Sequence, residues 1–399
     1  MNEKEVLEAV KNIRDICLNK GQDGLLELCE KFDKVKMSTL KMKVPDVEIA
    51  DELKEAIKIG VENITKFHKA EYERLIKCDE EIETSKGLVC WKRFTAIENV
   101  GLYVPNKLFS SILMNVIPAK ICGCEKITVC TPPNPSNEIL WTLKYLGIDE
   151  IFCIGGAQAI FAMAYGIGEV PKVSKIFGPG NEFVDTAKKM VSNEVAIDMP
   201  AGPSEVLVIA DENANQVATT YDLLAQSEHG RASKAWLLTT SQNLADFVNK
   251  NIEEVAKKSD RWWALEYSLK NLKVEVFDNL EDAIETSNNY APEHLIINTK
   301  NARELAKMVK NAGSVFVGSN TGESLGDYLS GTNHVLPTGG FAKMFSGLSV
   351  LSFGKFITFQ EATKDGLLGV QKQVKSMALA ECLGFHAKSV DRYLEDFGF

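Results

Sequence analysis

The chain has 399 residues, of which 45% are hydrophobic and 25% are charged, as in an ordinary globular protein. This length exceeds a single small core and predicts two or more domains. The net charge of −10, without a long basic run, argues against a nucleic-acid partner.

Apolar runs and cysteines indicate the cellular compartment in which the protein is expected. No uncharged apolar run approaches the ~20 residues that span a bilayer, and the N-terminus, Met1–Glu5, is charged, so we expect no membrane association. The nine cysteines are an odd number without paired spacing. A disulfide framework is therefore not expected, and a reducing, cytoplasmic location is predicted.

Residues 1–97 are predicted to form an N-terminal helical segment that packs on the second of two α/β modules. Val6, Val10 and Ile13 recur at helical spacing, and Gly21 and Gly24 interrupt this first helix. A second, long helix is predicted from about residue 49 to residue 76.

From about residue 98, short apolar strands alternate with helices. Repeated strand, glycine-rich turn and helix predict two Rossmann-like α/β modules with parallel sheets and ligand groups at the strand carboxyl ends. The first module is predicted over 98–200 and the second over 201–350, followed by a C-terminal helical arm over 351–399. The predicted strands are 127–131, 150–154 and 175–177 in the first module, and 206–210, 235–239, 273–277, 295–297 and 314–317 in the second.

Histidines are scarce and lie beside polar partners. Four of the five stand near acids or amides, which suggests metal or proton chemistry. Gln226 and His229 are spaced i, i+3 at the end of a predicted helix, so they face one side and could share a metal or ligand. A capped helix C-terminus explains the same pattern equally well.

Glu293 and His294 stand at the head of a predicted strand and could form a general acid–base pair. Neighbouring strand residues point to opposite faces, so both reach one site only if Pro292 makes the lead-in irregular. The long polar loop 318–340 adds Asp327 and His334 as candidate oxygen and nitrogen ligands, although a turn-forming Asp and an ordinary loop histidine fit too.

Other short motifs carry weaker signals. Ser204 is outside a G-x-S-x-G elbow, so a substrate-orienting hydroxyl fits it better than a nucleophile. The turns at 101–105, 155–158 and 178–181 contain glycines that could meet a dinucleotide, but none makes the G-x-G-x-x-G fingerprint. A nicotinamide site here would be non-standard.

Taken together, these motifs resemble the histidinol dehydrogenase family over nearly the whole chain. The resemblance implies an aldehyde-dehydrogenase-like arrangement of the two modules, and a C-terminal arm that completes a homodimer. The matching blocks, in order, are Gly155–Ile160, Lys175–Asn181, Ile197–Asp211, Gln226–Gly230, Ala291–Leu295, Gly313–Gly318 and Gly326–Thr338.

The resemblance implies oxidation of L-histidinol to L-histidine through L-histidinal, with two NAD and one zinc ion per subunit. Glu293 and His294 would be the catalytic pair, and His334 would support the site. The other implied roles are zinc ligands Gln226, His229, Asp327 and His386, the last from the partner subunit; substrate contacts Ser204, Gln226, His229, His294, Asp327, Glu381 and His386; and NAD contacts Tyr103, Gln158 and Asn181.

The resemblance departs after Pro105, where Asn106, Lys107 and Leu108 replace the glycines usual in the family, so the NAD contact near Tyr103 is expected to differ. Three other functions compete. One is an NAD-dependent dehydrogenase of another polar alcohol, and another is a zinc-stabilised scaffold without turnover. The third is an aldehyde dehydrogenase with Cys130 or Cys153 as its nucleophile.

Overall fold

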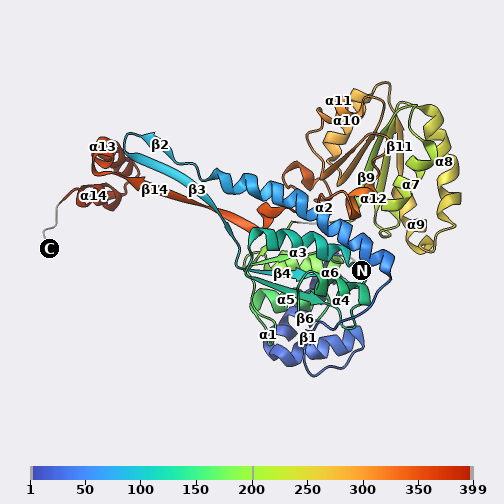
Figure 1. Cartoon of the computed structure of the whole chain (residues 1–399), viewed down its shortest axis with the longest axis horizontal. Coiled ribbons are helices and arrows are strands. Elements are labelled where there is room, and N and C mark those ends of the chain that lie inside the picture. Colours follow the sequence, from blue (N-terminus) through green and yellow to red (C-terminus); the bar gives the residue numbers. More distant parts are fainter. Residues whose placement is uncertain (1–2, 200–201, 396–399) are drawn as a thin grey trace. The chain divides into compact units, whose positions relative to one another are not determined.

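The computed structural model describes residues 3–199 and 202–395, with the side chain of Cys78 left out, and divides into two units. The first unit comprises residues 1–69 and 97–353, and the second comprises residues 70–96 and 354–399. The first unit contains two separate sheets flanked by helices, and the second contains a small sheet and two helices (Figure 1).

The first sheet has the order β1-β6-β5-β4-β7-β8 and is parallel except for its edge strand β1. Its central strands are almost fully buried, as expected when helices cover both faces. Its elements are β1 (Lys41–Lys43), β4 (Asn99–Tyr103), α3 (Ser110–Cys122), β5 (Lys126–Thr131), α4 (Asn137–Tyr145), β6 (Glu150–Cys153), α5 (Gly156–Tyr165), β7 (Lys175–Phe177), α6 (Glu182–Val191) and β8 (Ala196–Ile197).

The second sheet is entirely parallel, in the order β11-β10-β9-β12-β13. Every residue of its central strands β9 and β12 is buried, and each such Val, Leu or Ile side chain contributes roughly 1.5–3 kcal/mol. Its elements are β9 (Glu205–Ala210), α7 (Gln216–Ser227), β10 (Lys234–Thr239), α8 (Gln242–Ala256), α9 (Trp262–Ser268), β11 (Lys273–Val276), α10 (Leu280–Tyr290), β12 (His294–Asn298), α11 (Ala302–Ala306), β13 (Ser314–Val317) and α12 (Glu323–Tyr328).

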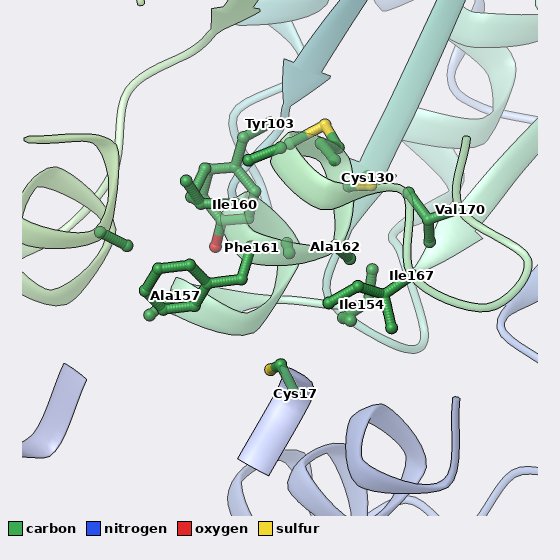
Figure 2. Packing of buried hydrophobic residues seen from close by; sticks show 14 of the residues in the cluster. Cys17, Tyr103, Cys130, Ile154, Ala157, Ile160, Phe161, Ala162, Ile167 and Val170 are labelled. Atoms are coloured by element: carbon green, nitrogen blue, oxygen red, sulfur yellow. The ribbon is translucent and has the colours of Figure 1, made fainter. Parts of the chain in front are cut away.

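The N-terminal helix α1 (Glu3–Asp33) belongs to the first sheet's core. It kinks at Gly21, whose φ of 57° and ψ of −133° lie outside the helical region, and this confirms the interruption predicted at that glycine. Figure 2 shows Cys17 of α1 facing the buried cluster that includes Ile160 and Phe161 of α5. The prediction that the N-terminal segment packs on the second module is therefore wrong for α1.

The second long helix, α2 (Asp51–Leu75), contacts residues of both modules. Ile57 and Ile64 pack with Leu113 of α3, whereas the Asn63 side-chain amide donates to the backbone oxygen of Leu329 at 2.8 Å. His68 is buried in this helix and its Nδ1 lies 2.9 Å from the Ile64 carbonyl oxygen, which is ordinary helical packing.

The second unit is built on an antiparallel sheet in the order β14-β3-β2. The strands are β2 (Ile82–Ser85), β3 (Leu88–Ala96) and β14 (Gly354–Ala362), and the helices are α13 (Lys364–Ala380) and α14 (Gly384–Arg392) (Figure 1). A purely helical arm was predicted here, so β14 is a correction. Trp91 stacks on Phe359 across β3 and β14, and such aromatic cross-strand pairs stabilise strands that expose most of their residues. None of the helices described is long and apolar enough to cross a membrane.

Candidate active site

A cavity of about 260 Å³ in the first unit brings most of the predicted site residues together. The first module contributes the segments that follow the carboxyl ends of β4, β7 and β8. In the second module the groups come from the amino ends of β9 and β12 instead, which differs from the expected carboxyl-end location. The lining includes Ser204, Gln226, His229, Glu293, His294, Asp327 and His334.

Glu293 and His294 converge on Gln226 at the back of this cavity. The Gln226 amide nitrogen donates to Glu293 Oε2 at 3.2 Å and lies 3.2 Å from His294 Nδ1. Glu293 Oε2 also accepts the backbone N–H of Glu205 at 2.8 Å. Both side chains therefore face one site, which requires an irregular backbone at the lead-in around Pro292.

The backbone before β12 explains this convergence. Ala291 ends α10 in the left-handed conformation, with φ of 56°, which turns the chain sharply before Pro292. The Glu293 carbonyl then accepts from the Ser314 N–H, and a side chain on Gly313 would bring a Cβ within 2.6 Å of that carbonyl oxygen. Only glycine permits this close approach without a shift.

The tautomer of His294 follows from its backbone contact. Its Nδ1 lies 3.2 Å from the carbonyl oxygen of Glu205, which can only accept and therefore favours a proton on Nδ1, while the Gln226 amide nitrogen, also 3.2 Å from Nδ1, donates to Glu293 Oε2 instead. Nε2 is left with a lone pair and has no hydrogen-bond partner among the described residues. Burial lowers the pKa of His294 to about 3, so the ring is neutral at pH 7 and its Nε2 is able to accept a proton.

The pKa values of the carboxyl groups around His294 are shifted in the opposite direction from that of His294. Burial raises the pKa of Glu293 well above its usual value, and burial raises the pKa of Asp327 to about 6. Asp327 Oδ1 is 3.7 Å from His294 Nε2, and the Asp327 backbone oxygen lies 2.8 Å from His334 Nδ1. Groups with opposed pKa shifts in one cavity are typical of proton-transfer sites.

The predicted zinc ligands divide between the two units. Gln226, His229 and Asp327 line the cavity and offer the mixed oxygen and nitrogen donors that zinc accepts. Gln226 Oε1 is buried without a hydrogen-bond partner among the described residues, so it is free to serve as a ligand. Residues 3–199 and 202–395 contain no cluster of three or more His, Cys, Asp or Glu side chains suited to a metal. The predicted zinc ligands are not a cluster of this kind, because they include the amide of Gln226 and a residue of the second unit.

Glu381 and His386 lie in the second unit and are exposed on its surface. They are not among the side chains that line the cavity of the same chain. Their assignment as substrate and zinc contacts remains a prediction.

The three residues predicted to contact NAD line a second, larger cavity of about 620 Å³. The Gly156 N–H donates to the Tyr103 hydroxyl at 3.1 Å, Gln158 is buried in the first turn of α5, and Asn181 caps α6. Tyr103 keeps this place although the loop after Pro105 departs from the family. The Gly178–Asn181 turn touches both cavities, because Gly178, Pro179 and Gly180 line the smaller one and Asn181 the larger.

Sequence reasoning missed a buried ion pair that holds this turn. Lys188 pairs with Asp198, and both line the smaller cavity. Lys188 Nζ donates to the Gly178 oxygen at 3.1 Å, while Asp198 Oδ2 accepts from the Gly178 N–H at 3.0 Å. Lys188 lies in an amphipathic helix where a lysine usually faces solvent, so no local signal could have revealed the pair.

The alternative thiol nucleophiles lie outside the cavity. Cys130 and Cys153 belong to buried strand ends of the first sheet. Burial raises the pKa of the Cys153 thiol to about 11 and that of Cys130 further still, so both stay protonated at neutral pH.

Comparisons with known proteins agree with this architecture. A family model described as histidinol dehydrogenase matches residues 1–394. Histidinol dehydrogenases from Bacteroides thetaiotaomicron and Haemophilus influenzae are 44% and 45% identical, over 98% of this chain and 93% and 92% of theirs. The crystal structure of histidinol dehydrogenase from Elizabethkingia anophelis superposes with a TM-score of 0.90 at 40% identity, covering 97% of this chain and 92% of that one.

A more distant likeness concerns the fold alone. An indole-3-acetaldehyde dehydrogenase in apo form has a TM-score of 0.50 at 17% identity, over 91% of this chain and 82% of that one. Two α/β modules in this arrangement define an aldehyde-dehydrogenase-like fold. The chain belongs to the histidinol dehydrogenase family, which places it in histidine biosynthesis.

Proposed function

We propose that the protein oxidises L-histidinol to L-histidine by way of L-histidinal, with zinc and two NAD. The proposal rests on His294 Nε2, which has no hydrogen-bond partner among the described residues and lies in the cavity that also holds Gln226, His229 and Asp327. The neutral imidazole can accept the proton of an alcohol, but burial lowers its pKa to about 3, so a neighbouring carboxylate such as Asp327 would have to stabilise the imidazolium that forms.

In the first step His294 Nε2 takes the hydroxyl proton of the substrate. The Glu205 carbonyl keeps the other ring proton on Nδ1, so the accepting nitrogen is fixed. The Ser204 hydroxyl, which also lines the cavity, would orient the substrate. NAD, when bound, accepts the hydride that leaves the carbinol carbon in this step and the hydrated aldehyde carbon in the next.

In the second step Glu293 activates the water that attacks the aldehyde. Its carboxylate accepts hydrogen bonds from the Glu205 N–H and the Gln226 amide, which hold one oxygen in place. Because burial raises the pKa of Glu293, its ionised form is a stronger base than an exposed carboxylate. The aldehyde would stay bound in the cavity between the two steps.

Zinc would be held by Gln226, His229, Asp327 and His386 of the partner subunit. It would supply a positive charge that orients the imidazole and amino groups of histidinol. The unpartnered Gln226 Oε1 and the cavity-lining His229 and Asp327 support this set on one chain.

NAD would occupy the larger cavity beside Tyr103, Gln158 and Asn181. Its volume of about 620 Å³ lies within the usual range for ligand sites of about 300–1,000 Å³. The Gly178–Asn181 turn touches both cavities, which supports a path for the nicotinamide end toward His294.

A homodimer with shared active sites is part of the same proposal, because Glu381 and His386 are exposed on a separate unit and thus available to a second copy. Subunits of inactive His294→Ala and inactive His386→Ala would be mixed after partial unfolding. The mixture should regain about a quarter of the parent activity, because about half of all dimers are mixed and one of the two sites in each mixed dimer is intact. No recovery from dimers shown to be mixed would contradict shared sites.

The reaction itself is tested by stoichiometry. L-Histidinol in limiting amount should yield two NADH and one histidine per molecule. The departure at Asn106–Leu108 favours one alternative, the oxidation of another polar alcohol on the same scaffold. That reaction would show a higher kcat/KM for the other alcohol, with one NADH formed per molecule if the aldehyde is released.

A further inference from the structure

A third cavity, of about 610 Å³, is lined in part by Glu205 and Pro292. It is lined by four lysines and a single carboxylate, that of Glu205. The local charge is therefore positive on a chain whose net charge is −10. We call it the lysine pocket, and its lysines are Lys234, Lys270, Lys273 and Lys343.

Most of this positive charge is unneutralised. Lys234 pairs with Glu205 Oε1 at 3.0 Å, and Lys273 Nζ donates to the Tyr290 hydroxyl at 3.3 Å. Within the part of the chain that the structure describes, Lys270, Lys273 and Lys343 have no carboxylate partner within ion-pair distance. Three unpaired ammonium groups around one concave space favour a ligand with several negative charges.

The pocket is built on buried residues rather than on surface lysines alone. Glu205 is only 3% exposed, and its second oxygen accepts the Gly339 N–H at 3.1 Å. Trp236 is 5% exposed, and its ring packs against that of Tyr290 with centroids 5.1 Å apart. The indole N–H of Trp236 has no hydrogen-bond partner among the described residues, so this buried donor is available to a ligand.

Glu205 connects this pocket to the catalytic pair. Its side chain lines the lysine pocket, while its N–H donates to Glu293 Oε2 at 2.8 Å and its carbonyl oxygen lies 3.2 Å from His294 Nδ1. An anion that competes for Lys234 would release the Glu205 carboxylate from its ion pair. The backbone of the same residue would then hold Glu293 and His294 differently.

We propose that the lysine pocket binds a multiply charged phosphate-type anion and that its occupancy changes the positions of Glu293 and His294 through the backbone of Glu205. A volume of about 610 Å³ exceeds a single phosphate and accommodates a diphosphate with an organic group. The binding half of the proposal is independent of the proposed function, and the coupling half rests on it.

Binding is tested by equilibrium dialysis of radiolabelled pyrophosphate against the full-length, zinc-loaded protein at fixed ionic strength. The double variant Lys270→Met/Lys343→Met should bind about tenfold more weakly or worse, because two exposed ammonium contacts are lost. The matched control is Lys250→Met/Lys258→Met, which removes two exposed lysines outside the pocket and should bind like the parent. No binding by the parent, equal affinity in both double variants, or displacement by NAD would overturn the site.

Coupling is tested by kcat and KM of histidinol oxidation at fixed pH with and without saturating pyrophosphate. The kcat of the parent should change, and that of Lys270→Met/Lys343→Met should not. An unchanged kcat of the parent would overturn the coupling. Equal inhibition of the parent and this double variant would also overturn it, because pyrophosphate would then be acting by removing the metal. If L-histidinol is not a substrate at all, the proposed function fails while the dialysis result still decides the site.

Discussion

Glu293→Gln should separate the two oxidation steps. The amide keeps the size of the side chain and one oxygen to accept the Glu205 N–H at 2.8 Å, but it cannot take a proton from water. Loss of a general base slows a step by about 10²–10⁴, equivalent to ~3–5 kcal/mol in the barrier. Histidinal oxidation should fall by this factor, whereas histidinol oxidation, which uses His294, should stay within about tenfold of the parent.

The assay is single-turnover NADH formation in a rapid-mixing instrument, with histidinol or histidinal supplied separately. Glu281→Gln, in the exposed first turn of α10, is the matched control and should leave both steps unchanged. The ionised form of Glu293 is the base, and burial raises the pKa of this carboxyl, so the histidinal step of the parent should weaken as pH falls through that raised pKa. Histidinal oxidation by Glu293→Gln at the parent rate would refute the assigned role.

Three further predictions concern other parts of the site. His294→Ala should slow histidinol oxidation by about 10²–10⁴ while substrate binding, measured by calorimetry, changes little; turnover at the parent rate would remove His294 as the base. Lys188→Met should lower the free energy of unfolding, measured in urea, by about 3–5 kcal/mol, because Asp198 stays buried without its cation. The double variant Lys188→Met/Asp198→Asn should recover part of this loss. An unaltered urea midpoint for Lys188→Met would refute the structural role of the pair. Cys130→Ser/Cys153→Ser should retain kcat within about twofold because neither thiol lines the active-site cavity, and complete loss in a folded protein would revive the thiolate mechanism.

Local sequence patterns predicted the parallel sheets well. The strand predicted over 206–210 is β9, and Gly21, one of the two glycines noted near the start, is the kink in α1. The Glu293–His294 pair was recognised with its structural condition, an irregular lead-in, and Ala291 provides it through a positive φ. A β-branched, fully apolar strand and a glycine break both have local causes, which is why sequence shows them.

Other features depend on contacts far apart in the chain. The segment Gly354–Ala362 was predicted to belong to a helical arm, yet it forms a strand that pairs with β3. The prediction failed because this pairing depends on contacts between distant parts of the chain, such as the stacking of Trp91 on Phe359, which no local pattern encodes. Glu205 was recognised only as part of a motif, and its three contacts with Glu293, His294 and Lys234 come from tertiary structure.

The central claim is that a metal held beside Glu293 and His294 is needed for oxidation of L-histidinol. The most direct test is NADH formation from L-histidinol by the purified protein before chelation, after removal of the metal, and after return of stoichiometric zinc, with bound metal measured in each sample. We predict loss of activity on chelation and recovery with about one zinc per subunit. Undiminished NADH formation by protein shown to be free of metal would contradict the account.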